Sequence, residues 1–326
     1  MTDIPSSLPL VIVAGPTASG KSALALAIAE RFRGMVINAD SMQVYRDLHV
    51  LTARPSPAEE ARAPHRLYGV LDAAEHGTAS VWCGLARQAI AEAAEKGLLP
   101  ILCGGTGMYM RALTEGLARI PAIPADIRDQ AVAALTELGT AGLHGRLAAA
   151  DPETAARLKT GDSQRVLRAW EVWLATGRGL AAWQREAAEP GLPNPVCRIL
   201  LRPPRGPLYA RIDRRFEAMM AAGALEEARK FAERRDIPAD APVRKAHGLP
   251  ELLQYLRGEL PLAQAIAIAQ TNTRHYAKRQ TTWFRHQMQP DLVEETDLGE
   301  KENFNPGAKI FPFLMGYLLT VGYGGV

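Results

Sequence analysis

Runs of apolar residues alternate with segments of helical periodicity in the first third of the chain. Apolar runs occupy residues 10–14 and 98–103, and residues 35–39 are apolar apart from Asn38; each segment has the length of a strand buried on both faces. Helical spacing marks residues 20–33 and 84–96. Strands that alternate with helices predict an α/β fold, in which a parallel sheet is flanked by helices on both faces.

The pattern changes in the middle of the chain. Residues 115–195 are rich in Ala, Leu, Arg and Glu at helical spacing, and prolines open and close this region. A new apolar run at 196–201 predicts a return to the sheet, after which helical periodicity dominates. We therefore expect a core made of residues 8–114 and 196–290, interrupted by a helical insertion.

Residues 291–326 form a tail that the pattern sets apart from this core. Its last part, residues 311–326, is apolar but only 16 residues long and is interrupted by proline and glycine. A helix that crosses a membrane needs about 20 residues. We expect a packed or poorly ordered tail and no membrane contact, and the pattern assigns this tail no function.

A phosphate-binding motif follows the first predicted strand. Residues 15–22 match G-x-x-x-x-G-K-[ST] at every position, and the motif stands between a strand and a helix, as it must. Loop N–H groups and the helix N-terminus attract an anion, Lys21 offers a charge to the terminal phosphates, and the Ser22 hydroxyl is suited to Mg²⁺. The predicted diphosphate site consists of eight residues: Gly15, Pro16, Thr17, Ala18, Ser19, Gly20, Lys21 and Ser22.

Two more loops follow strands that end at the same predicted edge of the sheet. Asp40 comes directly after the second strand, where a carboxylate can hold Mg²⁺, cap a helix or accept a proton. Spacing alone favours the first two roles. The third strand leads into Gly104, Gly105 and Thr106 with no acidic residue, which argues against an ordinary site for nucleotide hydrolysis.

Composition places the chain among globular proteins of the cytoplasm. The 326 residues are 47% hydrophobic and 22% charged, with a formal net charge of +3. Cys83, Cys103 and Cys197 lie far apart without the spacing of metal ligands, so we expect reduced thiols in a core. The first residues lack the pattern of an export signal.

Positive charge is concentrated near the end of the core. On a helix, Arg274, Lys278 and Arg285 fall on one face, and aromatic side chains such as Tyr276 and Trp283 lie beside them. Basic groups next to aromatic rings suit an RNA backbone with an unstacked base. A solvated helix face explains this segment equally well.

Together these segments resemble the tRNA dimethylallyltransferase family, in the same order and from about residue 9 to about residue 290. A pair of residues, Leu249-Pro250, departs from the Gly-Tyr-Lys/Arg of many relatives, and the zinc finger of some eukaryotic relatives is missing. The segments that carry the resemblance are 15–22, 40–45, 64–67, 104–106, 162–169, 211–216 and 276–285.

The resemblance implies a prenyl transfer. Dimethylallyl diphosphate would give its allyl group to N6 of the adenosine 3′ to the anticodon (position 37), in tRNAs that read codons beginning with U. Asp40 would be the base, and Thr17, Arg211 and Arg215 would assist departure of the diphosphate with Mg²⁺ at Ser22. The enzyme would be a monomer whose contacts to the anticodon stem-loop come from Asp40, Ser41, Met42, Gln43, Thr106, Gln164, Arg165, Arg168, Arg274, Lys278, Arg279 and Arg285.

Three alternatives remain open from the residues alone. An ATP-dependent small-molecule or nucleotide kinase shares the phosphate-binding loop but leaves the basic helix unexplained. An RNA-binding protein without catalysis leaves Asp40 unexplained. An adenylate isopentenyltransferase that acts on free nucleotides does not require the helical insertion.

Overall fold

The computed structural model describes residues 4–186, 189–295 and 305–325. Its contacts divide the chain into two compact units, one made of Met1–Leu113 with Pro193–Val326 and the other of Thr114–Leu192. The sequence places the insertion at 115–195, close to the second unit. The tail that the sequence sets apart from residue 291 belongs, by its contacts, to the first unit.

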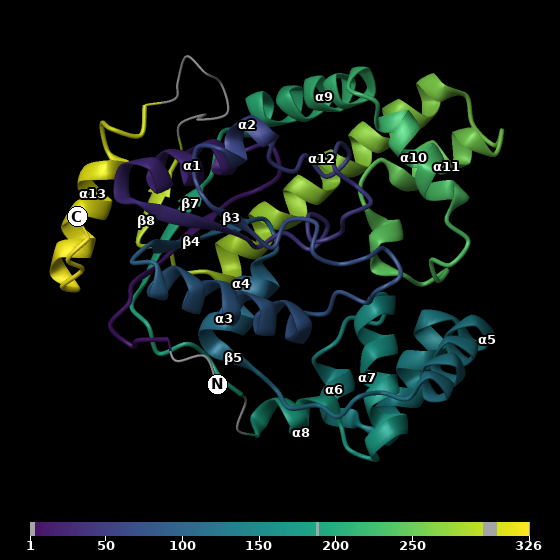
Figure 1. Cartoon of the computed structure of the whole chain (residues 1–326). Coiled ribbons are helices and arrows are strands. Elements are labelled where there is room, and N and C mark those ends of the chain that lie inside the picture. The colour runs from purple at the N-terminus through teal and green to yellow at the C-terminus, as the bar shows by residue number, and fades with distance from the viewer. Residues whose placement is uncertain (1–3, 187–188, 296–304, 326) are drawn as a thin grey trace. The chain divides into compact units, whose positions relative to one another are not determined.

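A six-stranded sheet organises the first unit, in the spatial order β3-β2-β4-β1-β7-β8 (Figure 1). Every neighbouring pair is parallel, as predicted. Two short edge strands, β3 and β8, carry no apolar run and were not predicted. The strands are β1 Leu10–Ala14, β2 Gly34–Asn38, β3 His65–Arg66, β4 Leu99–Gly104, β7 Val196–Leu201 and β8 Leu292–Glu294.

The two helices predicted over residues 20–33 and 84–96 are both present, and the second begins earlier than predicted. Helix α3 begins at Ala79 and not near residue 84, because the Thr78 hydroxyl accepts a hydrogen bond from the Val81 N–H and caps the helix. The helices are α1 Lys21–Phe32, α2 Pro57–Glu60, α3 Ala79–Glu95, α4 Gly107–Glu115, α9 Arg205–Ala221, α10 Ala224–Glu233, α11 Leu249–Leu256, α12 Leu262–Gln287 and α13 Ile310–Thr320, with the 3₁₀ turn η1 Pro242–Lys245.

Helices α1 and α13 cover one face of the sheet together (Figure 1). Phe32 of α1 meets Phe311 edge to face, with ring centroids 5.8 Å apart. The apolar end of the chain is thus a packed helix, one of the two states expected. Pro312 does not break it, since the first turn of a helix needs no N–H donor. No described helix is long and apolar enough to cross a membrane.

Helix α3 covers the opposite face and is anchored where β2 ends. The buried Trp82 indole N–H donates to the Asn38 carbonyl at 2.8 Å. The same ring stacks on Tyr109 of α4, with centroids 4.6 Å apart. The ends of β2 and β4 are therefore held together by aromatic packing on this face of the sheet, as well as by the hydrogen bonds between the two strands.

The second unit is mainly helical, as the composition predicts. Its apolar core includes Leu143, Leu147, Val166 and Trp170, which come from two helices packed side by side. A short antiparallel pair of strands lies at its ends. The elements are β5 Gly116–Leu117, α5 Ala125–Ala150, α6 Pro152–Ala156, α7 Ser163–Thr176, α8 Leu180–Arg185 and β6 Glu189–Pro190.

Close approach of two strand ends makes Gly104 a sensitive position. A Cβ there would overlap the carbonyl group of Ala39, which is backbone and cannot turn aside. We expect Gly104→Ala to lower the free energy of unfolding by about 2–3 kcal/mol in urea denaturation. The control is Gly84→Ala on α3, where a Cβ meets nothing within 4 Å and a gain of about 0.5–1 kcal/mol is expected. Equal stability of the two variants would contradict the close-approach argument.

Candidate active site

The phosphate-binding loop connects β1 to α1 and ends in a strained turn. Ala18 and Gly20 both have positive φ, 62° and 91°, and α1 begins at the next residue, Lys21. A Cβ on Gly15 would come within 3.0 Å of the Leu201 carbonyl, so this glycine lets the loop pack against β7. The conformation places the N-terminus of α1 behind the loop, which is the arrangement that binds anions.

Lys21 lies inside this loop. Its Nζ donates to the Pro16 carbonyl at 3.3 Å. Burial lowers the pKa of Lys21, and the negative charge of Asp40 opposes that shift. A bound diphosphate would favour the charged ammonium far more than a single carbonyl does. Ser22, the next residue, is exposed, and its side chain is hydrogen-bonded to the buried Cys103 thiol.

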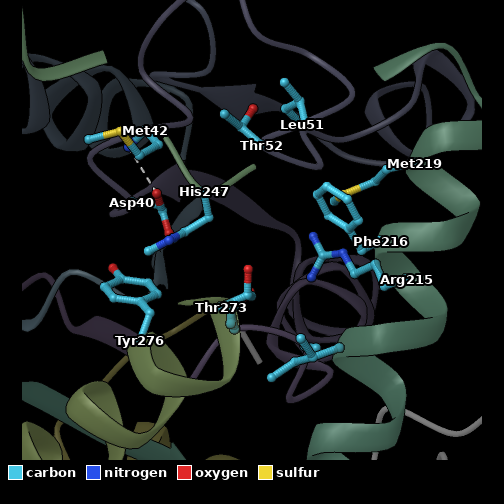
Figure 2. A pocket seen from close by; sticks show the side chains of 13 residues that line it. Asp40, Met42, Leu51, Thr52, Arg215, Phe216, Met219, His247, Thr273 and Tyr276 are labelled. Carbon is cyan, nitrogen blue, oxygen red and sulfur yellow. Dashed lines mark hydrogen bonds between the residues drawn. The ribbon is translucent and has the colours of Figure 1, made fainter. Parts of the chain in front are cut away.

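Asp40 is held at the carboxyl end of β2 by a buried neighbour, Asn38. The Asn38 side chain accepts from the Asp40 N–H at 2.8 Å and donates to the Asp40 carbonyl at 3.0 Å. One carboxylate oxygen of Asp40 then accepts from the Met42 N–H at 2.9 Å. This turn fixes the carboxylate at the sheet edge, as Figure 2 shows. The sequence analysis did not single out Asn38.

Thr106 ties the loop after β4 to the loop after β2. Its hydroxyl accepts from the Ser41 N–H at 3.0 Å and lies 3.3 Å from the Ser41 hydroxyl. Both residues were predicted to contact tRNA. In this structure Thr106 and Ser41 hydrogen-bond to each other, so they hold the loops after β4 and β2 together at the edge of the sheet.

Helix α12 crosses this edge. Its Gln280 side chain connects the phosphate-binding loop after β1 to the loop after β4. This buried side chain accepts from the Thr17 N–H at 2.8 Å and donates to the Gly105 carbonyl at 2.9 Å. A Cβ on Gly105 would overlap the Gln280 amide, and one on Gly107 would overlap the Trp283 ring. The closely spaced glycines after β4 are the sequence signal that a helix passes there, and sequence reasoning did not connect them to Gln280.

A pocket opens in front of these loops within the first unit (Figure 2). Asp40, His247, Thr273 and Tyr276 give it a polar end, and Arg215 lies between that end and an apolar end. Apolar side chains from α9 and from the loop after β2 form the second end. The lining residues are Thr17, Ala18, Asp40, Met42, Leu51, Thr52, Ile212, Arg215, Phe216, Met219, His247, Thr273 and Tyr276.

His247 and Tyr276 form a ring pair beside Asp40, with centroids 4.3 Å apart. Burial lowers the pKa of His247 and raises the pKa of Tyr276. At neutral pH both are therefore uncharged groups that can hydrogen-bond a polar ligand. Neither was predicted as a site residue. His247 precedes α11 in a stretch without a chemical motif, and Tyr276 was considered only as an aromatic neighbour of the basic face of α12.

The two predicted arginines of α9 have different partners. Arg211 Nε donates to the Ala18 carbonyl at 2.5 Å and so holds the phosphate-binding loop. Arg215, one turn later, lines the pocket, where burial lowers its pKa and Asp40 opposes the shift. Only Arg215 directly lines the pocket as a cation.

The basic face of α12 is less uniform than its spacing suggests. Lys278, Arg279 and Arg285 are exposed. Arg274 is half-buried and pairs with Asp213 of α9, with Nη1 and Oδ1 2.5 Å apart. The charge of Arg274 is therefore largely compensated within the protein, which leaves Lys278 and Arg285 exposed on this face and Arg279 on the neighbouring one.

Gln43, another predicted tRNA contact, also has protein partners. Its Nε2 donates to the carbonyls of Thr52 and Ala53, at 2.8 and 3.0 Å. Its amide thus supports the turn that follows Asp40 in the chain.

The predicted contacts in the second unit lie at the start of α7. Gln164, Arg165 and Arg168 are exposed there. Arg165 stands 3.5 Å from Asp162, which caps the helix, and Arg168 pairs with Glu171 at 3.1 Å. The Arg165 pair is exposed and therefore weak, so Arg165 is available to an anionic partner, whereas Arg168 pairs with a buried carboxylate.

Comparisons with known proteins match this architecture. Residues 43–287 match the family model of IPP transferases. The chain is 55% identical over 279 residues to a tRNA dimethylallyltransferase of Nitrobacter hamburgensis, covering 85% of this chain and 88% of the relative. It is 50% identical over 317 residues to that of Rhodospirillum rubrum, covering 97% of each.

Solved structures agree with these sequence matches. The full-length tRNA isopentenylpyrophosphate transferase of Bacillus halodurans is 34% identical, with a TM-score of 0.69 over 97% of this chain and 98% of that one. A eukaryotic dimethylallyltransferase, crystallised acting on tRNA, is 26% identical, with a TM-score of 0.79 over 95% and 80%. With its motifs, fold and relatives in agreement over most of its length, this protein belongs to the tRNA dimethylallyltransferase family.

Proposed function

We propose that this protein transfers the dimethylallyl group from dimethylallyl diphosphate to N6 of adenosine 37, in tRNAs that read codons beginning with U. One observation carries the proposal: the phosphate-binding loop and Asp40 open onto the same pocket. An anion site, a carboxylate and an apolar surface are what the donor and the nucleophile of this reaction require.

The donor would lie across the pocket. Its diphosphate belongs in the loop 15–22, where backbone N–H groups, Lys21 and the N-terminus of α1 converge. Its allyl group belongs at the apolar end, against Phe216 and Met219. Arg215 stands between these two ends, close to where the bond between C1 and the diphosphate oxygen breaks.

The reaction forms a bond from N6 to C1 and releases diphosphate. An exocyclic amine conjugated to a purine is a weak nucleophile, so removal of its proton by Asp40 would raise the rate by about 10²–10⁴. Charge that develops on the diphosphate would be stabilised by Lys21, by Arg215 and by the Thr17 hydroxyl, since the Thr17 N–H is donated to Gln280. His247 and Tyr276, uncharged beside Asp40, would orient the adenine edge.

The residues present fit Mg²⁺ as a companion of the diphosphate. The described residues contain no group of three or more His, Cys, Asp or Glu that would hold a metal by themselves. Mg²⁺ commonly takes most of its ligands from phosphate oxygens and water, and the exposed Ser22 hydroxyl suits it as a protein ligand. When bound there, it would neutralise charge on the leaving group.

The tRNA would be held by exposed cations. In the first unit these are Lys278, Arg279 and Arg285 of α12, and in the second unit they lie at the start of α7. The target adenosine must leave its stack to reach Asp40, which costs less in a single-stranded loop than in a duplex. We propose a monomer that acts in the cytoplasm, in keeping with its three buried cysteine thiols.

Lys21→Ala tests the donor site and the reaction together. The parent protein, incubated with unmodified tRNA, Mg²⁺ and dimethylallyl diphosphate, should yield dimethylallyladenosine by mass spectrometry of the nucleosides. The variant should lose transfer. It should keep its fold, since the hydrogen bond from Lys21 Nζ to the Pro16 carbonyl is long, at 3.3 Å. Transfer at the parent rate in the variant, or consumption of ATP in place of the diphosphate by the parent, would refute the proposal.

Asp40→Asn separates the possible roles of this carboxylate. The amide keeps the size and can still accept from the Met42 N–H, but it cannot take the N6 proton. Single-turnover transfer should fall by about two orders of magnitude or more, with tRNA and donor affinities little changed. Partial rescue by raised Mg²⁺ would instead indicate a metal-ordering role.

Lys278→Ala tests the basic face of α12, since Lys278 is exposed and Arg274 is already paired. Loss of one phosphate contact should reduce the slope of log Kd against log salt concentration by about one unit or slightly less. Lys96→Ala is the control, because Lys96 follows α3 at the opposite edge of the sheet and pairs with Glu92. Equal slopes for both variants would return α12 to an ordinary solvated face.

A further inference from the structure

The loop after β2 supplies one wall of the pocket without regular secondary structure. Leu51 and Thr52 line the pocket, and both lie in the turn 49–53. Two backbone hydrogen bonds close the turn, from the Ala53 N–H to Val50 and from the Arg54 N–H to His49. Such a turn points several N–H groups to one side, which creates a site for an anion within the protein.

The carboxylate of Glu227, from α10, occupies that position. It accepts from three consecutive N–H groups: His49 at 2.5 Å, Val50 at 2.9 Å and Leu51 at 2.8 Å. Hydrogen bonds to an ionised acceptor are about twice as strong as neutral ones. One side chain thus holds the backbone of the wall from a helix that is far away in sequence.

Carbonyl groups of the same turn also accept hydrogen bonds from side chains. Gln43 donates to the carbonyls of Thr52 and Ala53, and the Thr52 hydroxyl donates to the Leu48 carbonyl at 2.6 Å. Acceptors and donors of the turn are therefore satisfied by different segments. Glu227 is the contact that sets its distance from α10.

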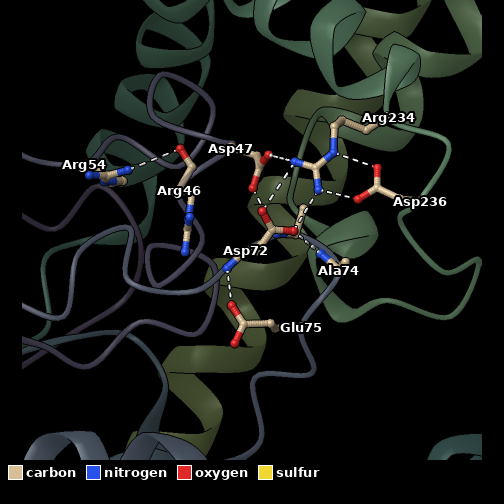
Figure 3. Close-up of polar contacts among 9 residues, drawn as sticks. Arg46, Asp47, Arg54, Asp72, Ala74, Glu75, Arg234 and Asp236 are labelled. Atoms are coloured by element: carbon tan, nitrogen blue, oxygen red, sulfur yellow. Dashed lines mark hydrogen bonds and ion pairs between the residues drawn. The ribbon is translucent and has the colours of Figure 1, made fainter.

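A second contact from α10 stabilises the base of this loop. Arg234, directly after the helix, binds Asp47 at 2.7 Å and Asp72 at 2.8 Å, and Asp236 at 2.6 Å (Figure 3). Asp47 also accepts from the Ala73 N–H at 2.9 Å. The loop is thus fixed at its start by Arg234 and at its pocket-lining turn by Glu227.

Close packing across the pocket makes the placement of this turn consequential. A Cβ on Gly248 would come within 2.5 Å of the Phe216 ring and 3.3 Å of Leu51 Cδ2. Leu51 is buried there, opposite the apolar side chains of α9. A small outward movement of the turn would lengthen the apolar end of the pocket.

We propose that Glu227 is a positioning residue that, through Leu51, limits the length of the prenyl group the enzyme accepts. The inference rests on the proposed function, because it assigns the apolar end of the pocket to the allyl group. With the turn held against α9, a five-carbon group fills the space. A ten-carbon group requires the wall to move, which the three hydrogen bonds to Glu227 oppose.

The test compares Glu227→Gln with Glu226→Gln. Glutamine offers one acceptor oxygen and an NH₂ group that would face the N–H donors of the turn. Glu226, the neighbouring residue, pairs only with Arg229 on the exposed side of α10 among the contacts described here, which makes it a matched control. For each variant we would measure the melting temperature and kcat and KM with dimethylallyl diphosphate and with geranyl diphosphate.

The ratio of kcat/KM for the five-carbon donor to that for the ten-carbon donor should fall about tenfold in Glu227→Gln, within the range that a hydrophobic pocket controls. Glu226→Gln should keep the parent ratio. Leu51→Ala should lower the ratio while leaving the carboxylate in place. Because a merely structural role of Glu227 would lower stability without changing the ratio, donor selectivity is the deciding readout.

An unchanged ratio in Glu227→Gln would overturn the inference, and so would an unchanged ratio in Leu51→Ala. Should Glu227→Gln fail to fold, Leu51→Ala alone decides whether this wall sets donor length. If the parent protein transfers no prenyl group from either donor, the proposed function fails first. A parent that transfers the five-carbon group and variants that behave like it would refute only the role of Glu227.

Discussion

The site depends on one buried amide, Gln280, which joins the two loops that follow the neighbouring strands β1 and β4. It binds the phosphate-binding loop at Thr17 and the loop after β4 at Gly105. Without Gln280, the Thr17 N–H and the Gly105 carbonyl would be buried without a hydrogen-bond partner, at a cost of about 1–3 kcal/mol each. The same helix turn carries Tyr276 into the pocket, so one contact aligns the anion site with the acceptor side.

Around this contact, polar groups shape the edge of the sheet more than they face a ligand. Asn38, Thr106 and Arg211 each bind backbone or hydroxyl groups of a neighbouring loop. The three loops are thereby preorganised, and the polar groups left in the pocket are one carboxylate, one arginine, a pair of uncharged rings and the threonines Thr17, Thr52 and Thr273. Charge that develops during prenyl transfer would then meet fixed partners and little water.

Two helices outside the site, α10 and α13, support it without lining the pocket. The residues that line the pocket do not include any of α10, yet Glu227 of this helix holds the wall that carries Leu51. Helix α13 packs on α1 from behind the phosphate-binding loop, where its apolar side chains complete the core. Distant parts of the chain thus support a site made of loop residues and of side chains from α9 and α12.

The sequence by itself determined the parallel sheet, the anion loop and the placement of Asp40, because these follow from local periodicity and from the shared edge of parallel strands. It also identified the family through its motifs. It did not determine that Gln43, Ser41 and Arg274 bind protein groups, or that Gln280, His247 and Glu227 stand at the site. Only the tertiary structure decided those partners, because a side chain many residues away in sequence satisfies each donor or acceptor, and no local pattern encodes such a pairing.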